Sequence, residues 1–226
     1  MNTHIEAVLF DNDGVIANSE ELWTEIDTQF LSEHGIAYAG EHKTNIIGTS
    51  FPSAVGFYRN RYGLQPSIEE LVQRRHAIAD DFYTSRIELF PDVTHVLKTL
   101  HARGIRIALG TSAIRALAEP FLQRHGIHHY FDAITTGDDV AHGKPAPDIY
   151  LNAAEKLGVA PANCLVVEDA LAGVEAGKSA GMRVAAIPDE RWNDVTKYHG
   201  YADFVMKNLG EVPDLVEKLN ATKTAS

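Results

Sequence analysis

The chain has 226 residues, of which 31 are acidic and 20 are basic, so its formal net charge at pH 7 is -11. Nucleic-acid and anionic-membrane surfaces need clustered Lys and Arg, so this excess of acid argues against both kinds of partner. The 45% hydrophobic content predicts a globular chain with a core, and the one cysteine, Cys164, excludes an internal disulfide. Apolar runs are too short to span a bilayer and carboxylates come too early for a signal peptide, so we expect a cytoplasmic protein. We also expect the protein to be a monomer.

The first predicted element is a buried strand at residues 8–10, an apolar run that ends at Asp11. After Gly14 the pattern changes, because apolar residues then recur at helical spacing and continue to do so until about Arg86. We expect Asn18 or Ser19 to be the N-cap of the first helix.

The rest of this helical region contains one clear helix and one clear break. A Ser67 to Glu70 capping-box pattern opens a long helix over 67–85. The segment 45–54 contains Gly and Pro and is predicted to be a loop. No strand is expected between Ala17 and Arg86.

From Pro91 onward, helical and strand patterns alternate. The predicted helices cover 92–104, 114–126, 146–158 and 171–181, and the predicted strands cover 105–112, 131–136, 164–169 and 182–188. Such alternation predicts an α/β fold with a Rossmann-like, doubly wound parallel sheet. We therefore expect a core domain of residues 1–17 and 87–226, with a small all-helical insert of residues 18–86. Linkers near 17–19 and 85–90 would let the insert hinge over the core.

Polar side chains follow four of the predicted strands or the loops after them. They are Asp11, Asp13, Thr111, Ser112, Lys144, Glu168 and Asp169. Because the carboxyl ends of parallel strands lie along one edge of a sheet, we expect these groups to converge. Carboxylates can hold Mg²⁺, a hydroxyl and a lysine can neutralise phosphoryl oxygens, and one carboxylate remains to attack phosphorus. The set predicts phosphoryl transfer.

Each piece has a purely structural alternative. The Asp11-x-Asp13-Gly14 stretch is also typical of a turn, Thr111 can cap a helix, and Lys144 can be a solvated surface residue. A phosphate-binding P-loop is not favoured at 173–179, because its glycine spacing is one residue short and the stretch reads as helix. The joint placement at strand ends favours a functional site.

The combined motifs resemble those of the haloacid dehalogenase superfamily, in its phosphatase and phosphomutase branch. The matching stretches, in order, are "DNDGV", "GTS", "GKPAPD" and "VEDALAGVEAGKSAGM". The helical insert resembles the C1 type of cap domain in that family. The "GKPAPD" stretch resembles the subgroup that contains sugar-phosphate phosphatases and beta-phosphoglucomutase.

The resemblance implies a role for each motif residue. Asp11 would be the nucleophile that forms an aspartyl-phosphate, and Asp13 the general acid and base. Mg²⁺ would be bound by Asp11, the main-chain carbonyl of Asp13 and Asp169, with Glu168 assisting directly or through water.

Two further motifs would handle the substrate. Thr111 and Lys144 would hold the transferring phosphoryl group, with Ser112 beside them. Insert residues that could face the core are Trp23, Asn45, Ser50, Phe51, Tyr58 and Arg75. Of these, Trp23, Asn45 and Ser50 are our candidate substrate-binding residues.

The choice of reaction within the family depends on other positions. Asp13 argues against dehalogenases and phosphonoacetaldehyde hydrolases, which lack a second carboxylate in the first motif. A beta-phosphoglucomutase-type sugar-phosphate mutase would need polar groups where this chain has Trp23, Phe51, Ala113 and Ile114. We therefore expect a Mg²⁺-dependent phosphatase for a small phosphorylated metabolite, a sugar or polyol phosphate, with the mutase as the alternative.

Two readings outside the enzymes of this family also exist. A phosphoacceptor module like a response-regulator receiver shares the sheet, the Asp and the Mg²⁺, but it is shorter and has no helical insert. A catalytically silent binder of a phosphorylated metabolite would be expected to lack some of the core groups, and here all of them are present.

Overall fold

The computed structural model describes residues 4–40, 46, 49–191 and 193–221. Among these residues, six strands form one parallel sheet in the order β5-β4-β1-β6-β7-β8. The strands are β1 (Ala7–Phe10), β4 (Arg106–Gly110), β5 (Ala133–Thr135), β6 (Cys164–Glu168), β7 (Arg183–Ala186) and β8 (Phe204–Val205). The chain runs from β1 toward β5 on one side and later from β6 toward β8 on the other. The order therefore reverses beside β1, where ligand sites of such sheets form.

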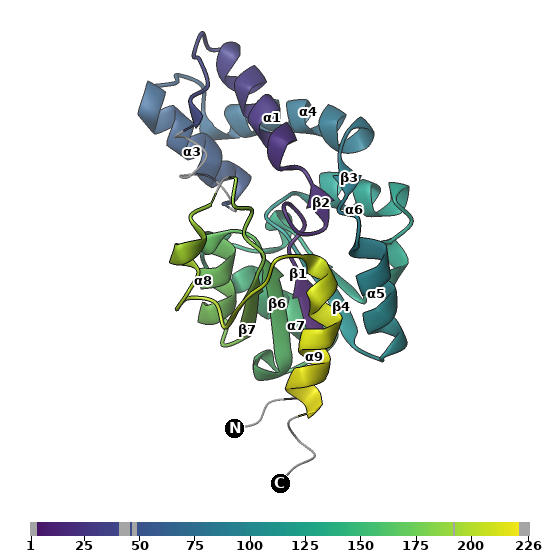
Figure 1. Cartoon of the computed structure of the whole chain (residues 1–226). Coiled ribbons are helices and arrows are strands. Elements are labelled where there is room, and N and C mark those ends of the chain that lie inside the picture. The colour runs from purple at the N-terminus through teal and green to yellow at the C-terminus, as the bar shows by residue number, and fades with distance from the viewer. Residues whose placement is uncertain (1–3, 41–45, 47–48, 192, 222–226) are drawn as a thin grey trace.

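Helices cover both faces of the sheet (Figure 1). They are α5 (Val93–Ala102), α6 (Arg115–Arg124), α7 (Asp148–Leu157), α8 (Leu171–Ser179) and α9 (Val212–Ala221). Side chains of β1 alternate between two apolar clusters: Val8 and Phe10 pack with α5, α6 and α9, whereas Ala7 and Leu9 pack with α7 and α8. The doubly wound α/β fold predicted from the sequence is confirmed.

The helical insert lies above the carboxyl end of the sheet, at the top of Figure 1. It contains α1 (Glu20–Ser32), α3 (Phe51–Tyr62) and α4 (Ile68–Ser85). The predicted capping box at the start of α4 is present: Glu70 N donates to Ser67 Oγ (3.2 Å), and Ser67 N donates to the Glu70 carboxylate (2.8 Å). The helices form a cap that shares one apolar cluster with the core.

The two connections between cap and core lie side by side. β2 (Ala17–Asn18) and β3 (Glu88–Leu89) pair as a short antiparallel ribbon. The expectation of no strand between Ala17 and Arg86 was therefore wrong at Ala17 and Asn18. A strand of two residues forms only where a distant segment of the chain pairs with it, so the local sequence does not indicate it. We propose 18–86 as the cap domain and 1–17 with 87–226 as the core, a division that this double crossing supports.

Two other elements differ from the sequence expectations. The predicted loop 45–54 ends early, because α3 begins at Phe51 with Ser50 as its N-cap. Pro52 is compatible with the first turn of α3, because backbone N–H groups there have no carbonyl partner within the helix and the missing N–H of proline costs no hydrogen bond. At the other end of the chain, β8 and α9 extend the fold beyond the last predicted strand.

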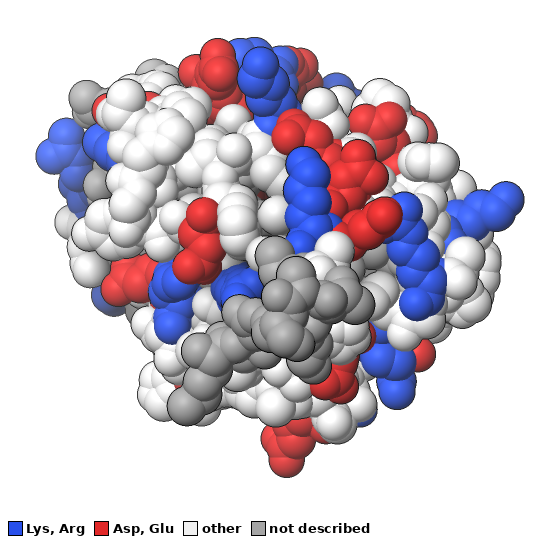
Figure 2. Space-filling view, turned by 60° about the horizontal axis from the view of Figure 1, so that its bottom comes forward, with Lys and Arg blue, Asp and Glu red and all other residues white. Residues whose placement is uncertain are grey.

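The surface carries charges of both signs. On the face turned forward in Figure 2, Lys and Arg lie among Asp and Glu. Exposed ion pairs include Arg103–Glu217 (3.3 Å) and Arg106–Asp132 (3.1 Å). Within the described part of the chain, none of the helices combines the length and apolarity needed to cross a membrane.

Candidate active site

A buried lysine joins two of the predicted carboxylates at the carboxyl end of β1. Lys144 Nζ lies 2.6 Å from Asp11 Oδ1 and 2.6 Å from Glu168 Oε1. The three residues are at most 5% exposed. Since buried charges are costly unless they are paired and hydrogen-bonded, the lysine balances part of the negative charge that the fold gathers here.

Glu168 is held through both of its carboxylate oxygens. Oε1 accepts from Lys144 and also from the Tyr150 hydroxyl (2.6 Å), whereas Oε2 accepts from the backbone N–H groups of Asp169 (3.1 Å) and Ala170 (3.3 Å). A carboxylate with this many donors has a fixed orientation. Glu168 therefore fixes the position of Lys144 opposite Asp11.

Two glycines leave room for the carboxylates. A Cβ at Gly173, in the first turn of α8, would lie 1.7 Å from the Glu168 carboxylate. A Cβ at Gly14 would lie 2.1 Å from Asp169 Oδ2, and Gly14 also has a positive φ of 82°. The glycines of the P-loop-like stretch 173–179 thus lie in helix α8, which packs against the site.

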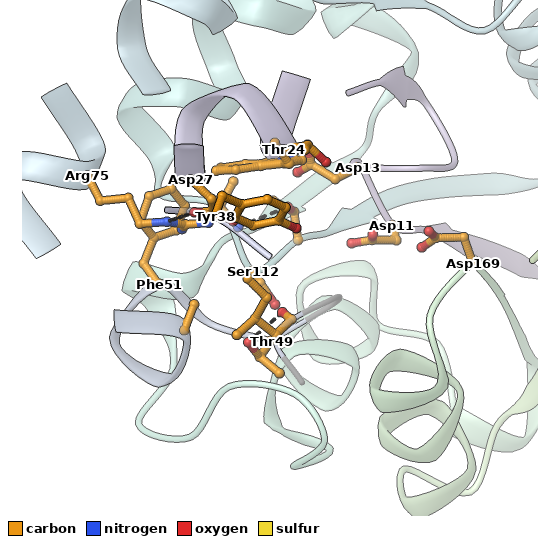
Figure 3. Close-up of a pocket in the computed structure, with 15 residues that line it drawn as sticks. Asp11, Asp13, Thr24, Asp27, Tyr38, Thr49, Phe51, Arg75, Ser112 and Asp169 are labelled. Atoms are coloured by element: carbon orange, nitrogen blue, oxygen red, sulfur yellow. Dashed lines mark hydrogen bonds and ion pairs between the residues drawn. The ribbon is translucent and has the colours of Figure 1, made fainter. Parts of the chain in front are cut away.

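The chemistry of this cluster suits a metal ion. Asp11, Glu168 and Asp169 are buried and offer ligand oxygens that all lie within 4.8 Å of one another. Figure 3 shows Asp11 and Asp169 next to each other, with the Asp169 carboxylate directed toward Asp11. Hard oxygen donors of this kind suit Mg²⁺, and the space beside Gly14 lets the Asp169 carboxylate approach the β1 loop.

The protonation of Asp11 reflects its surroundings. Burial raises the pKa of Asp11 to about 8, with Lys144 opposing the rise and the negative charges of Glu168 and Asp13 adding to it. Burial also opposes the charge of Lys144, but its two carboxylate partners raise the pKa of the ammonium and keep it protonated. A bound divalent cation would favour the ionised form of Asp11.

Asp13 has different neighbours, which come from the cap and the linker. Its Oδ1 accepts hydrogen bonds from Ser19 Oγ (2.6 Å), Trp23 Nε1 (2.8 Å) and the Tyr83 hydroxyl. Ser19 occupies the predicted N-cap position of α1 but makes no side-chain capping bond there, because its hydroxyl is directed to Asp13. Asp13 is thus held by side chains on α1 and α4 and by the linker between core and cap.

The Tyr83 hydroxyl keeps its proton and donates it to Asp13. Burial and the adjacent Asp13 raise the pKa of its hydroxyl well above 10. The Tyr83 ring also packs edge-on against Phe121 of α6, with ring centres 6.1 Å apart. The contact to Asp13 therefore occurs where the cap helix α4 packs on the core.

The hydroxyl motif lies at the end of β4. Thr111 is 1% exposed, and its Oγ1 accepts from the Ala113 N–H (3.1 Å). The N-cap of α6 is Ile114, so Thr111 does not serve as the helix cap that was its structural alternative. Thr111 also lines the pocket, where its hydroxyl can donate to a ligand.

One pocket runs from these core groups into the cap (Figure 3). Its core end is lined by Asp11, Asp13, Thr111, Ser112, Ala113 and Asp169. Its cap end is lined by Trp23, Thr24, Asp27, Tyr38, Ile46, Thr49, Phe51, Ala54 and Arg75. Three of the predicted motifs therefore line this pocket, and the fourth joins them through the contacts of Lys144 with Asp11 and Glu168. The cap covers all four.

The cap residues named from the sequence have different positions. Trp23 lines the pocket and donates to Asp13. Ser50 accepts from Ser53 N (3.3 Å) as the N-cap of α3 and lines a neighbouring hollow beside Lys144. Tyr58 is fully buried in the cap, and Asn45 lies outside the described residues.

Several residues of the site were not identified from the sequence. Tyr83, Tyr150 and Ser19 hydrogen-bond to the predicted carboxylates, and Asp27 lines the cap end of the pocket. Asp27 carried a signal, because it lies one helical turn after Trp23 on the same face of α1. The tyrosines are far from their partners along the chain, so no local spacing indicated them.

Comparison with known proteins identifies the family. A model of the haloacid dehalogenase-like hydrolases matches residues 8–187, most of the chain. The chain belongs to this family. The hydrolase is 33% identical over 178 residues to a phosphorylated carbohydrates phosphatase of Thermotoga maritima, covering 79% of this chain and 82% of that relative.

Two further relatives agree. The (DL)-glycerol-3-phosphatase 1 of Arabidopsis thaliana is 32% identical over 218 residues, covering 91% of this hydrolase and 70% of that protein. A crystal structure of CbbY from Rhodobacter sphaeroides with phosphate aligns with a TM-score of 0.80 at 27% identity, covering 92% of this chain and 96% of that chain. This haloacid dehalogenase-like hydrolase is a phosphatase, a phosphoric monoester hydrolase.

Proposed function

We propose that this hydrolase is a Mg²⁺-dependent phosphatase that acts on small sugar or polyol phosphates through an aspartyl-phosphate on Asp11. The observation that supports this most is the different setting of two carboxylates that line one pocket. Asp11 lies against Lys144 in the metal-binding cluster, whereas Asp13 is held by cap donors. Two carboxylates in such different environments are suited to two different roles.

In the first half-reaction, a carboxylate oxygen of Asp11 attacks phosphorus and the bond from phosphorus to the leaving oxygen breaks. Asp13 gives its proton to the leaving oxygen, so that a neutral alcohol departs. Since Oδ1 of Asp13 already accepts from Ser19, Trp23 and Tyr83, we assign the transferred proton to Oδ2.

In the second half-reaction, the Asp13 carboxylate accepts a proton from a water molecule. The water oxygen attacks phosphorus, and the bond between phosphorus and Asp11 breaks. Inorganic phosphate leaves, Asp11 regains its carboxylate, and Asp13 regains its proton, so the cycle balances.

Lys144 and Thr111 would position the phosphoryl group during both steps. The Lys144 ammonium already lies 2.6 Å from the attacking carboxylate, and the Thr111 hydroxyl lines the same pocket. Donors fixed in advance in a site closed to water stabilise charge that develops on phosphoryl oxygens. The N–H and hydroxyl groups of Ser112 would add to this end of the pocket.

Asp11, Asp169 and the main-chain carbonyl of Asp13 would hold the Mg²⁺, with Glu168 close enough to assist. When bound, Mg²⁺ would neutralise charge on the phosphoryl oxygens. The main part of Glu168, by its contacts, is to keep Lys144 and the Asp169 backbone in place.

The substrate class rests on relatives and on the pocket. The names of the two relatives given above refer to phosphorylated carbohydrates and to glycerol 3-phosphate. Hydrolysis is favoured over a mutase reaction, because Trp23 and Phe51 place rings rather than free charge where a second phosphate would have to be held.

The experiment is phosphate release by the purified protein from p-nitrophenyl phosphate and glycerol 3-phosphate, with Mg²⁺ and with excess EDTA. We expect Mg²⁺-dependent release of one phosphate per alcohol formed, and no release by the Asp11→Asn variant. Isomer interconversion of a sugar phosphate primed by a bisphosphate, with almost no phosphate released, would instead establish the mutase.

A further inference from the structure

A buried arginine occupies the cap end of the pocket, at the opposite end from Asp11 and Asp169 (Figure 3). The Arg75 guanidinium carbon lies 4.7 Å from the ring centre of Trp23 and 4.7 Å from that of Phe51. Arg75 is 5% exposed. Its guanidinium thus lies against two neighbouring aromatic rings, and their contact restricts its movement.

Asp27 of α1 neutralises this arginine. Arg75 Nε donates to Asp27 Oδ1 at 2.8 Å, and the two side chains are 6% and 3% exposed. Both residues line the pocket, so the pair offers its groups to a ligand while its net charge is zero. The Nη atoms of the guanidinium carry further N–H donors, and the carboxylate carries further acceptor positions.

The charges along the pocket are therefore unequal at its two ends. Among the described residues that line it, Arg75 is the cation at the cap end, and Asp27 balances it. The other cap-end side chains are uncharged, and the core end carries carboxylates. Lys144 is already engaged by Asp11 and Glu168. A second anionic group on the substrate could reach the Nη donors of Arg75 only beside the buried Asp27 carboxylate, whose negative charge would repel it.

We infer that the Asp27–Arg75 pair selects phosphomonoesters whose leaving alcohol is uncharged and carries hydroxyl groups. Hydroxyls can accept from the guanidinium and donate to the carboxylate without breaking the pair, and the aromatic rings can pack on the carbon skeleton. Leaving groups with a carboxylate or a second phosphate would be rejected. This inference rests on the proposed phosphatase function and narrows its substrate class.

A matched pair of substrates tests the inference. Glycerol 3-phosphate and 3-phosphoglycerate have the same carbon skeleton and phosphate ester, and differ in a terminal hydroxymethyl group against a carboxylate. We expect the wild-type protein with Mg²⁺ to have a kcat/KM for glycerol 3-phosphate at least about tenfold above that for 3-phosphoglycerate. This factor corresponds to the gain or loss of one contact with a charged group.

The Asp27→Asn variant should shift this ratio. Without the carboxylate, Arg75 becomes an unpaired cation at the cap end, so the ratio should move toward 3-phosphoglycerate by about 10- to 100-fold. Glu33→Gln is the matched control, because Glu33 pairs with Arg74, the neighbour of Arg75, on the exposed side of the cap (2.6 Å to Nε). This control should leave the ratio unchanged.

The outcomes separate the inference from the proposed function. If p-nitrophenyl phosphate and both glycerol compounds stay intact with Mg²⁺, the phosphatase proposal fails and the inference fails with it. If they are hydrolysed but the wild-type protein does not prefer glycerol 3-phosphate, the inference alone is wrong. A folded Asp27→Asn protein with an unchanged ratio would also overturn it. If that variant does not fold, the wild-type ratio decides.

Discussion

Replacing Tyr83 with Phe removes one of the hydrogen bonds that hold Asp13. The Tyr83 hydroxyl donates to Asp13 Oδ1, which also accepts from Ser19 (2.6 Å) and Trp23 (2.8 Å). A phenyl ring has nearly the same shape, so the packing of Tyr83 against Trp23 and Phe121 should remain. The change therefore tests how Asp13 is positioned, and Tyr83 is a positioning residue.

The expected loss follows from the number of donors. A hydrogen bond to a charged group contributes about 1.5–3 kcal/mol, which is roughly a 10- to 100-fold change in rate. Ser19 and Trp23 remain as donors, so the loss should stay below the roughly 10²- to 10⁴-fold contribution of general acid–base catalysis as a whole. We expect kcat/KM for glycerol 3-phosphate to fall roughly 10- to 100-fold in Tyr83→Phe.

The assay compares two leaving groups. With p-nitrophenyl phosphate the leaving group needs little protonation, so kcat/KM, which reports the steps through phosphorylation of Asp11, should change little in Tyr83→Phe. The exposed Tyr201 (64%) provides the control variant Tyr201→Phe, which should behave like the wild type with both substrates. Equal losses of kcat/KM for the two substrates, or no loss for glycerol 3-phosphate, would refute the positioning of Asp13 by Tyr83.

Three further predictions concern the buried cluster. Asp11→Asn should abolish turnover while the protein remains folded. In the metal-free wild type, protonated Asp11 stabilises the fold below the unfolded pKa, and this contribution is lost as pH rises through the folded pKa of about 8. The melting temperature of the metal-free wild type should therefore fall more between about pH 5 and pH 9 than that of the variant. Mg²⁺ should raise the melting temperature of the wild type and not that of Asp169→Asn, because ligand binding stabilises the folded state. Gly173→Ala should cost about 1–3 kcal/mol of stability and lower activity by displacing Glu168 and Lys144.

Each of these predictions has its own control or contradicting result. Equal pH slopes of the melting temperature in the wild type and Asp11→Asn would show that Asp11 does not titrate as assigned. A Mg²⁺-induced rise in Asp169→Asn equal to that in the wild type would place the metal elsewhere. Gly56→Ala, in α3 where a Cβ would meet nothing within 4 Å, should be neutral or stabilising, and a loss as large as in Gly173→Ala would refute the packing argument.

The part of the fold that the sequence predicts well is the alternation from Pro91 to Pro188. Buried parallel strands read as continuous apolar runs, so their ends mark where polar side chains leave the core. Asp11 and Glu168 were placed in this way, and both lie at the site with Lys144. The convergence of motifs far apart in the sequence follows from the rule that parallel strands end at one edge.

The features that the sequence did not predict depend on contacts between distant segments. β8 spans only Phe204–Val205 and is a strand because β7 pairs with it. The β2–β3 ribbon likewise forms only because both linkers meet. Elements this short have no periodicity from which to infer them.

Within the site, the same limit applies to the cap. Arg75 and Asp27 are 48 positions apart, and Tyr83 and Asp13 are 70 apart, so only the packing of α1, α4 and the core brings them together. Ser19 shows a second kind of limit. Its N-cap position was predictable, but the hydroxyl binds Asp13 instead of the helix.

The most direct test of the central claim is to locate the phosphorylated residue during turnover. Protein quenched in acid while it hydrolyses glycerol 3-phosphate with Mg²⁺ is reduced with borohydride, which converts an aspartyl-phosphate to homoserine, and is mapped by peptide mass spectrometry. With p-nitrophenyl phosphate, whose leaving group needs little protonation, Asp13→Ala should increase the trapped fraction, because the variant slows the attack of water more than the phosphorylation of Asp11. We predict homoserine at position 11. Phosphate release without any conversion at position 11, or conversion at another carboxylate, would contradict the assignment of Asp11 as the nucleophile.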